Sequence, residues 1–122
     1  IYHGYIKYNQ TIPYLLKSQI LLLIESDDKE SSYAIPAKIF EYINSGRPII
    51  AIGPKDSEVK DIINDTESGK YFLYNQYDDL LSYLLNSYHL YESKQLYSSS
   101  INIDKYHRKN LAKKLSDIIL DK

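Results

Sequence analysis

The chain has 122 residues, enough for one compact domain and too few for two domains of ordinary size. Its 15 basic and 16 acidic residues leave a formal charge of −1, which argues against a protein built mainly to coat nucleic acid. The sequence has no cysteine, which excludes disulfides, thiolate nucleophiles and cysteine-based metal centres.

No targeting or membrane-spanning segment is visible in the sequence. The longest apolar run, Ile20–Ile24, is far shorter than the roughly 20 residues of a membrane-spanning helix. The chain does not open with a basic segment followed by an apolar one, so we predict no signal peptide and expect a cytoplasmic protein. Because the sequence begins at Ile1 and contains no methionine, we also expect it to be part of a longer protein.

Apolar runs of strand length alternate with helical patterns along the chain. The apolar runs predict strands at Ile1–Tyr5, Gln19–Glu25, Pro48–Ile52 and Tyr71–Tyr74. The periodic segments predict helices at Gln10–Ser18, Pro36–Ser45 and Tyr77–Tyr91, a helix capped by Asp56 or Ser57 that runs to about Asp65, and a last helix capped by Asp104. Buried strands that alternate with helices are typical of a parallel sheet covered on both faces. We therefore predict one Rossmann-like α/β domain over residues 1–122, a three-layer sandwich with a parallel sheet of about four strands.

Three finer expectations follow from the same patterns. The most apolar runs, Ile20–Ile24 and Pro48–Ile52, should be the central strands of the sheet. Gly69 should end the helical unit that Asp56 or Ser57 begins. The fourth helix should bury one face, which is formed by Leu80, Leu81, Leu84, Leu85 and Tyr88.

A ligand of such a sheet is expected outside the carboxyl ends of the strands, near helix N-termini. Three segments follow predicted strands there: Gly4–Lys7, Glu25–Ile35 and Gly53–Asp56. The second segment is about ten residues long, whereas connections of this kind usually have two to six. It leads into the helix that Pro36 opens, so this helix start is the best candidate for a site.

Lys38 and Glu41 lie on one side of that helix, three residues apart. A cation in a first turn opposes the helix dipole by about 0.3–1 kcal/mol, and a bound anion would relieve this mismatch. Free backbone N–H groups at the same end also favour phosphate. The Glu41 carboxylate could then accept hydrogen bonds from sugar hydroxyls. A solvated Lys38–Glu41 pair on a surface helix explains the same spacing, and the spacing does not separate the two interpretations.

The segment Ile35–Ile52, IPAKIFEYINSGRPIIAI, resembles the signature of a known family. The signature belongs to the C-terminal, donor-binding domain of GT-B type nucleotide-sugar glycosyltransferases, and the chain is most similar to the group 1 (family 4) enzymes. The flanking segments agree with the family's order, and they are His3–Ile6, Leu15–Ile24, Asp56–Gly69 and the Tyr106-His-Arg start of the last helix. The resemblance covers residues 1 to about 72 well and the remainder loosely.

The resemblance implies a role for each of eight residues. Glu41 matches the glutamate that binds the ribose hydroxyls of the nucleotide, and the backbone of Ile35, Pro36 and Ala37 would face the diphosphate beside Lys38. The turn Gly4, Tyr5 and Ile6 would lie against the base and a phosphate. Many retaining enzymes of the family have a sugar-contacting glutamate where this chain has Tyr33, so the resemblance implies neither the donor sugar nor the stereochemistry.

The same resemblance implies a function for the whole protein. It would transfer a sugar from a UDP- or GDP-linked donor to a glycan or glycoconjugate acceptor in polysaccharide assembly. This chain would be the C-terminal half, working with an N-terminal acceptor-binding domain and needing no metal or other cofactor. It would contain no catalytic residue and be inactive alone. A noncatalytic α/β interaction domain and part of a nucleotide-sugar epimerase of similar architecture remain as alternatives.

Four other groups of residues have two interpretations each. The pair Asp27-Asp28 could ligate Mg²⁺ or be solvated, and Asp78-Asp79 could ligate Mg²⁺ or favour a helix dipole; neither pair has an evident third ligand. His3 could touch a phosphate or be an ordinary exposed histidine. The basic cluster around His107 could be a solvated helix face, or it could approach a partner domain or an anionic membrane surface, and its members are Lys105, Arg108, Lys109, Lys113 and Lys114.

Overall fold

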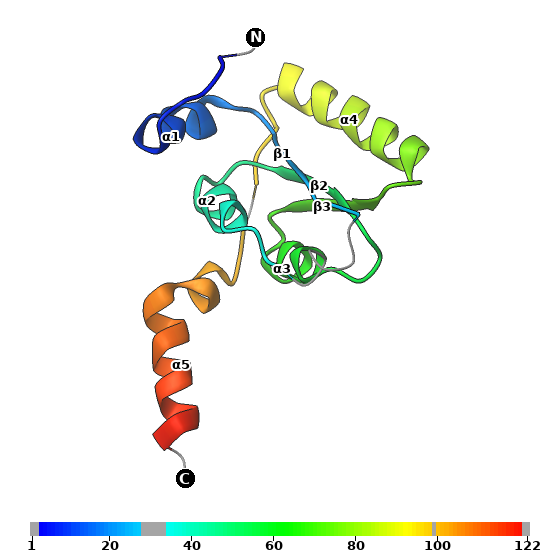
Figure 1. The fold of residues 1–122 in the computed structure, drawn as a ribbon. Helices are drawn as coiled ribbons and strands as arrows, with labels where there is room; N and C mark the ends of the chain where they lie inside the picture. Colours follow the sequence, from blue (N-terminus) through cyan, green and yellow to red (C-terminus); the bar gives the residue numbers. More distant parts are fainter. Residues whose placement is uncertain (1–2, 28–33, 99, 121–122) are drawn as a thin grey trace.

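A parallel β-sheet lies at the centre of the molecule (Figure 1). The computed structural model describes residues 3–27, 34–98 and 100–120. Its strands are β1 (Leu21–Ile24), β2 (Ile49–Gly53) and β3 (Gly69–Leu73), in the order β1-β2-β3. Both pairings are parallel, with Leu23 opposite Ala51 and Ala51 opposite Tyr71. Since a helix connects each strand to the next, the predicted Rossmann-like α/β fold is confirmed, with three strands in the described residues.

Helices lie on both faces of this sheet, and one helix extends away from it (Figure 1). The helices are α1 (Tyr8–Lys17), α2 (Lys38–Asn44), α3 (Glu58–Thr66), α4 (Tyr77–Glu92) and α5 (Arg108–Leu120), with a 3₁₀ turn, η1 (Ile103–Tyr106), before α5. The helices α2 and α3 cover one face, α4 lies over the other, and α5 projects from the body. Within the described ranges, no helix is long and apolar enough to cross a membrane.

The core lies between the sheet and the helices α2 and α3. Its members are Leu23, Ile49, Ala51 and Tyr71 of the sheet, Ile39 and Ile43 of α2, and Val59, Ile62 and Ile63 of α3. The spacings of three and four residues within each helix put these side chains on one stripe, which the alternate residues of the strands face. On the opposite face of the sheet, Phe72 packs against Tyr83 of α4 with ring centroids 5.7 Å apart.

β2 is the central strand, as predicted, but the prediction that β1 is central is wrong. Among the described residues β1 pairs with β2 alone. Leu21 and Leu23 are buried, whereas Leu22 and Ile24 on the other face are 53% and 58% exposed. An apolar run indicates that a strand is buried, but it does not indicate how many strands pair with it, which explains the error. The expected first strand is not formed at residues 3–5, and Ile1 and Tyr2 lie outside the described residues.

The structure gives Gly69 a different role from the predicted one. Ser57 caps α3 as expected, because its Oγ accepts hydrogen bonds from the N–H groups of Val59 (3.1 Å) and Lys60 (3.3 Å). The helix ends at Thr66, and Gly69 is already the first residue of β3. A Cβ atom on Gly69 would collide with the Ile49 carbonyl. The glycine therefore permits close strand pairing and does not end the helix.

The helices α4 and α5 also differ from their predictions. Tyr83 and Ser87 are on the inner face of α4, and Ser87 donates a hydrogen bond to the Tyr83 carbonyl at 2.8 Å. Leu80 is half-buried, while the other members of the predicted inner face are exposed, namely Leu81, Leu84, Leu85 and Tyr88. Phe72 of the sheet packs on Tyr83, so the face of α4 that contains Tyr83 points toward the sheet. Asp104 lies within η1 and does not cap α5, which begins at Arg108.

Candidate functional site

A hydrogen-bonded cluster joins the carboxyl ends of the three parallel strands. Glu25 follows β1, and its carboxylate accepts hydrogen bonds from the Ser57 hydroxyl at 2.8 and 2.9 Å and from the Tyr71 hydroxyl at 2.6 Å. The Tyr74 hydroxyl donates to the Glu25 backbone carbonyl at 3.0 Å. The carboxyl edge is where parallel α/β sheets bind ligands, so this cluster borders the expected position of a site.

Close packing holds the cluster together. Tyr71 is 8% exposed, and its burial together with the hydrogen bond to Glu25 raises the pKa of the phenol strongly. Tyr71 therefore stays a neutral donor over the ordinary pH range. At Gly53 a Cβ atom would collide with the Tyr71 hydroxyl and with the Glu25 carboxylate. A side chain at this position would therefore displace the Tyr71 hydroxyl and the Glu25 carboxylate from their present positions.

The start of α2 is exposed, while its next residues anchor it in the core. α2 begins at Lys38, two residues later than predicted, because Pro36 and Ala37 form the turn that precedes it. The N–H of Ile39 donates to the Pro36 carbonyl at 3.0 Å. Ile39 is fully buried, whereas Ala37 and Lys38 are exposed. Ile35, which enters this turn, is exposed too.

Glu41 contacts the first helix and not the neighbouring lysine. The Glu41 carboxylate lies close to the Tyr8 hydroxyl at the start of α1, and its polar interaction with this hydroxyl and its negative charge raise the pKa of Tyr8. The positive charge of Arg108 acts on the pKa of Tyr8 in the opposite direction. Within the described residues no ion pair joins Lys38 to Glu41. The two side chains are therefore not paired with each other, while Lys38 is exposed on the helix surface, as the solvated interpretation also expects.

The Tyr8–Glu41 contact brings two predicted parts of the site together. The turn Gly4–Ile6 lies just before Tyr8 in the chain, so the contact places this turn near α2. Gly4 has a φ of +67°, and the Tyr5 side chain is 95% exposed. His3 packs on Tyr14 of α1, with ring centroids 5.0 Å apart.

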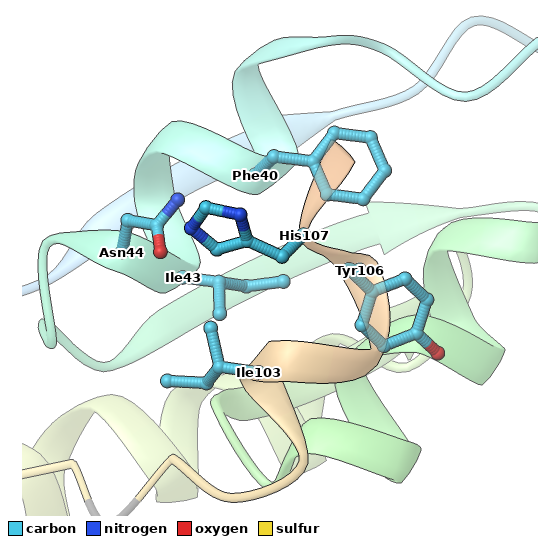
Figure 2. A pocket seen from close by; sticks show the side chains of 6 residues that line it. All are labelled: Phe40, Ile43, Asn44, Ile103, Tyr106 and His107. Atoms are coloured by element: carbon cyan, nitrogen blue, oxygen red, sulfur yellow. The ribbon is translucent and has the colours of Figure 1, made fainter. Parts of the chain in front are cut away.

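A small cavity lies behind α2, between this helix and η1 (Figure 2). Its volume is about 20 Å³, roughly the space of one water molecule and far too small for a nucleotide. The lining residues are Phe40, Ile43, Asn44, Ile103, Tyr106 and His107. Asp65 holds η1 in place by accepting hydrogen bonds from Lys105 at 2.9 Å and from Tyr106 at 2.8 Å. This cavity is a packing defect between α2 and η1 and not part of the candidate site.

Both aspartate pairs were considered as possible metal ligands. In the parts of the chain that the structure describes, no group of three or more carboxylate or imidazole side chains could hold a metal ion. Asp78 and Asp79 lie in the first turn of α4, and Asp79 accepts a hydrogen bond from Gln76 at 3.2 Å. Asp27 is exposed, and Asp28 and Tyr33 lie outside the described residues.

The candidate site thus has two parts along the sheet. One part is the surface at the start of α2, which includes Glu41 and the turn Gly4–Ile6. The other part is the Glu25 cluster, which the sequence did not predict although Glu25 is the first polar residue after an apolar run. Protein-family models, curated proteins and solved structures were compared with the chain, and none matches it.

Proposed function

We propose that this chain is the donor-binding domain of a GT-B type glycosyltransferase. In this proposal it works within a longer two-domain enzyme that transfers a sugar from a UDP- or GDP-linked donor to a glycan or glycoconjugate. The observation that supports the proposal is the proximity of the Tyr8 hydroxyl to the Glu41 carboxylate beside the start of α2. Tyr8 closely follows the turn Gly4–Ile6 in the chain, and the family resemblance assigns to this turn and to Glu41 contacts with one nucleotide.

The chemistry of this surface suits a nucleoside diphosphate. The Glu41 carboxylate has acceptor sites for the two ribose hydroxyls, and such charge-assisted hydrogen bonds are strong. The exposed Lys38 ammonium provides positive charge for the diphosphate. Tyr5 has an exposed ring against which a base could stack.

The proposal assigns the remaining functions to the other domain. The acceptor would bind there, across a cleft from the donor, and this chain alone would bind nucleotide weakly and transfer no sugar. Since nucleotide sugars are the donors, we place the enzyme in the cytoplasm, at the inner face of the membrane where glycoconjugate acceptors gather.

Calorimetric titration with UDP and GDP tests the proposal. Glu41→Ala should weaken binding of the preferred nucleotide by about ten- to a hundredfold, because hydrogen bonds to a charged group contribute roughly 1.5–3 kcal/mol. Glu58→Ala is a matched control, since Glu58 is also a glutamate in a first helical turn and lies on α3. The 2′-deoxy nucleotide should lose affinity for the unmodified chain and much less for Glu41→Ala.

The outcomes separate the proposal from its rivals. If neither the chain nor the full-length protein binds any nucleotide, a noncatalytic interaction domain is the better explanation. If the full-length protein converts a nucleotide sugar without an acceptor, it is an epimerase. Equal nucleotide affinities of Glu41→Ala and the unmodified chain would show that Glu41 does not contribute to nucleotide binding.

A further inference from the structure

The helix α5 presents an apolar face that the rest of the molecule does not cover. It extends away from the body of the protein (Figure 1), and each of its 13 residues is exposed. Leu111, Leu115, Ile118 and Ile119 follow helical spacing and are 44%, 59%, 66% and 58% exposed. In α3 the same spacing buries Val59, Ile62 and Ile63 almost completely. We call the four exposed residues of α5 the α5 stripe.

The rest of the helix is strongly basic. α5 contains Arg108, Lys109, Lys113 and Lys114 against one acid, Asp117, a net charge of +3 in a chain whose total is −1. At 100° per residue, Lys114 lies beside the edge of the α5 stripe, and Lys109 and Lys113 lie on the opposite face. Long lysine side chains can lie along an apolar surface and still keep their charge at its border. A surface that suits this helix is therefore apolar beneath the stripe and negatively charged beside Lys114 and toward the basic face behind it.

The base of the helix is fixed to the body of the protein. η1 immediately precedes α5, and Lys105 and Tyr106 of η1 are both hydrogen-bonded to Asp65 of α3. The helix is about 20 Å long, so the α5 stripe extends well beyond the core. This arrangement holds the stripe at the periphery of the molecule, where a large flat surface can reach it.

We propose that α5 binds the surface of an anionic lipid bilayer, lying in the plane of the membrane with the α5 stripe inserted among the acyl chains. Anionic headgroups provide the negative charge around the stripe and the hydrocarbon below them provides the apolar layer, which matches both requirements. A pair of α5 helices from two copies satisfies only the second requirement, because their positive charges would repel one another. The inference deepens the proposed function, which places the enzyme at the inner face of the membrane, but the binding requires no nucleotide, so a failure to bind vesicles would leave the nucleotide titration unaffected.

Co-sedimentation with vesicles tests the proposal. The full chain should bind vesicles of phosphatidylcholine mixed with phosphatidylglycerol, bind vesicles of phosphatidylcholine alone far less, and be released by salt. The double variant Leu115→Ser/Ile118→Ser should weaken binding by about tenfold or more, because it removes buried apolar area. Lys113→Glu/Lys114→Glu should weaken it by about tenfold or more, because it reverses two charges.

Matched variants show whether α5 itself is responsible. Leu81→Ser/Leu84→Ser removes two leucines of α4 that are each 42% exposed, and Lys55→Glu/Lys70→Glu changes the net charge by the same amount elsewhere. Both should bind as the unmodified chain does, and circular dichroism should show all four variants folded. The proposal is overturned if the unmodified chain does not bind the anionic vesicles, or if the control variants and the α5 variants lose vesicle binding equally. It is also overturned if the α5 variants abolish self-association instead, because the stripe would then be a protein interface.

Discussion

The hydroxyl of Tyr71 lies 2.6 Å from the Glu25 carboxylate and 2.8 Å from the Pro54 carbonyl. One side chain of β3 therefore joins the end of β1 to the loop that follows β2. Because the same carboxylate also accepts a hydrogen bond from Ser57 at the start of α3, Glu25 connects all three strand ends. Removal of the Tyr71 hydroxyl should loosen this edge of the sheet.

We expect Tyr71→Phe to lower the free energy of unfolding by about 1–2 kcal/mol, because it leaves the half-buried Glu25 carboxylate without one donor. Urea denaturation of the purified chain measures this change. Tyr74→Phe is the matched control, since it also removes a hydroxyl that bonds to Glu25, but Tyr74 is 44% exposed. Its cost should stay within about 0.5 kcal/mol. Equal losses in the two variants would show that the Tyr71 bond has no special role.

Gly69→Ala should be among the most damaging single substitutions in the protein. Its new Cβ atom would collide with the backbone of Ile49, so the central pairing of β2 and β3 would have to move. We expect a loss of about 3 kcal/mol or more, measured by urea denaturation. Lys70→Ala alters the next residue of the same strand, which is exposed, and should change stability by no more than about 0.5 kcal/mol. A stable Gly69→Ala protein would contradict the observed strand spacing.

The attachment of η1 to Asp65 of α3 should weaken at acid pH. Hydrogen bonds from Lys105 and Tyr106 lower the pKa of Asp65 in the folded protein. A group with a lowered folded pKa stabilises the fold fully above its unfolded pKa, about 3.9 for aspartate, and loses this effect as the pH falls through the folded value. The melting temperature of the unmodified chain should exceed that of Asp65→Asn near neutral pH, and the difference should shrink below about pH 4. A difference that does not vary with pH would exclude this linkage.

The function proposed above makes a further prediction for Tyr8. Its hydroxyl lies close to the Glu41 carboxylate, so it would compete with a ribose hydroxyl for the same acceptor. Tyr8→Phe should therefore raise nucleotide affinity by about two- to tenfold, the effect of one ordinary hydrogen bond. Calorimetry measures the change, and Tyr14→Phe on the same helix is the control. A loss of affinity in Tyr8→Phe would mean that the hydroxyl helps to bind the nucleotide.

The sequence predicted the elements of the fold well because their signals are local. The apolar runs around Leu23 and Ala51 and the Ser57 cap can each be recognised within a few residues. What the sequence could not predict depends on partners distant in the chain. The edge position of β1 and the choice of Tyr83 for the inner face of α4 follow from neighbours that local periodicity does not contain.

The same distinction applies to the candidate site. The start of α2 was predicted as a site from the long loop that leads to Pro36, and Lys38 and Glu41 were singled out because they are neighbours on one helix. The partner of Glu41 is Tyr8, which is 33 positions earlier in the sequence, and no local pattern indicates that contact. Likewise the Glu25 carboxylate meets Tyr71 only because three strands end at one edge of the sheet.

The strand order β1-β2-β3 also has a consequence for how the chain folds. Each strand pairs with the one that follows it in the sequence, and one short helix closes each intervening loop. No pairing between the first and last strands has to form before the middle strand can join, so the entropic cost of loop closure is met in small steps. We expect the sheet to assemble progressively from β-α-β units, faster than sheets of similar size whose adjacent strands come from distant parts of the sequence.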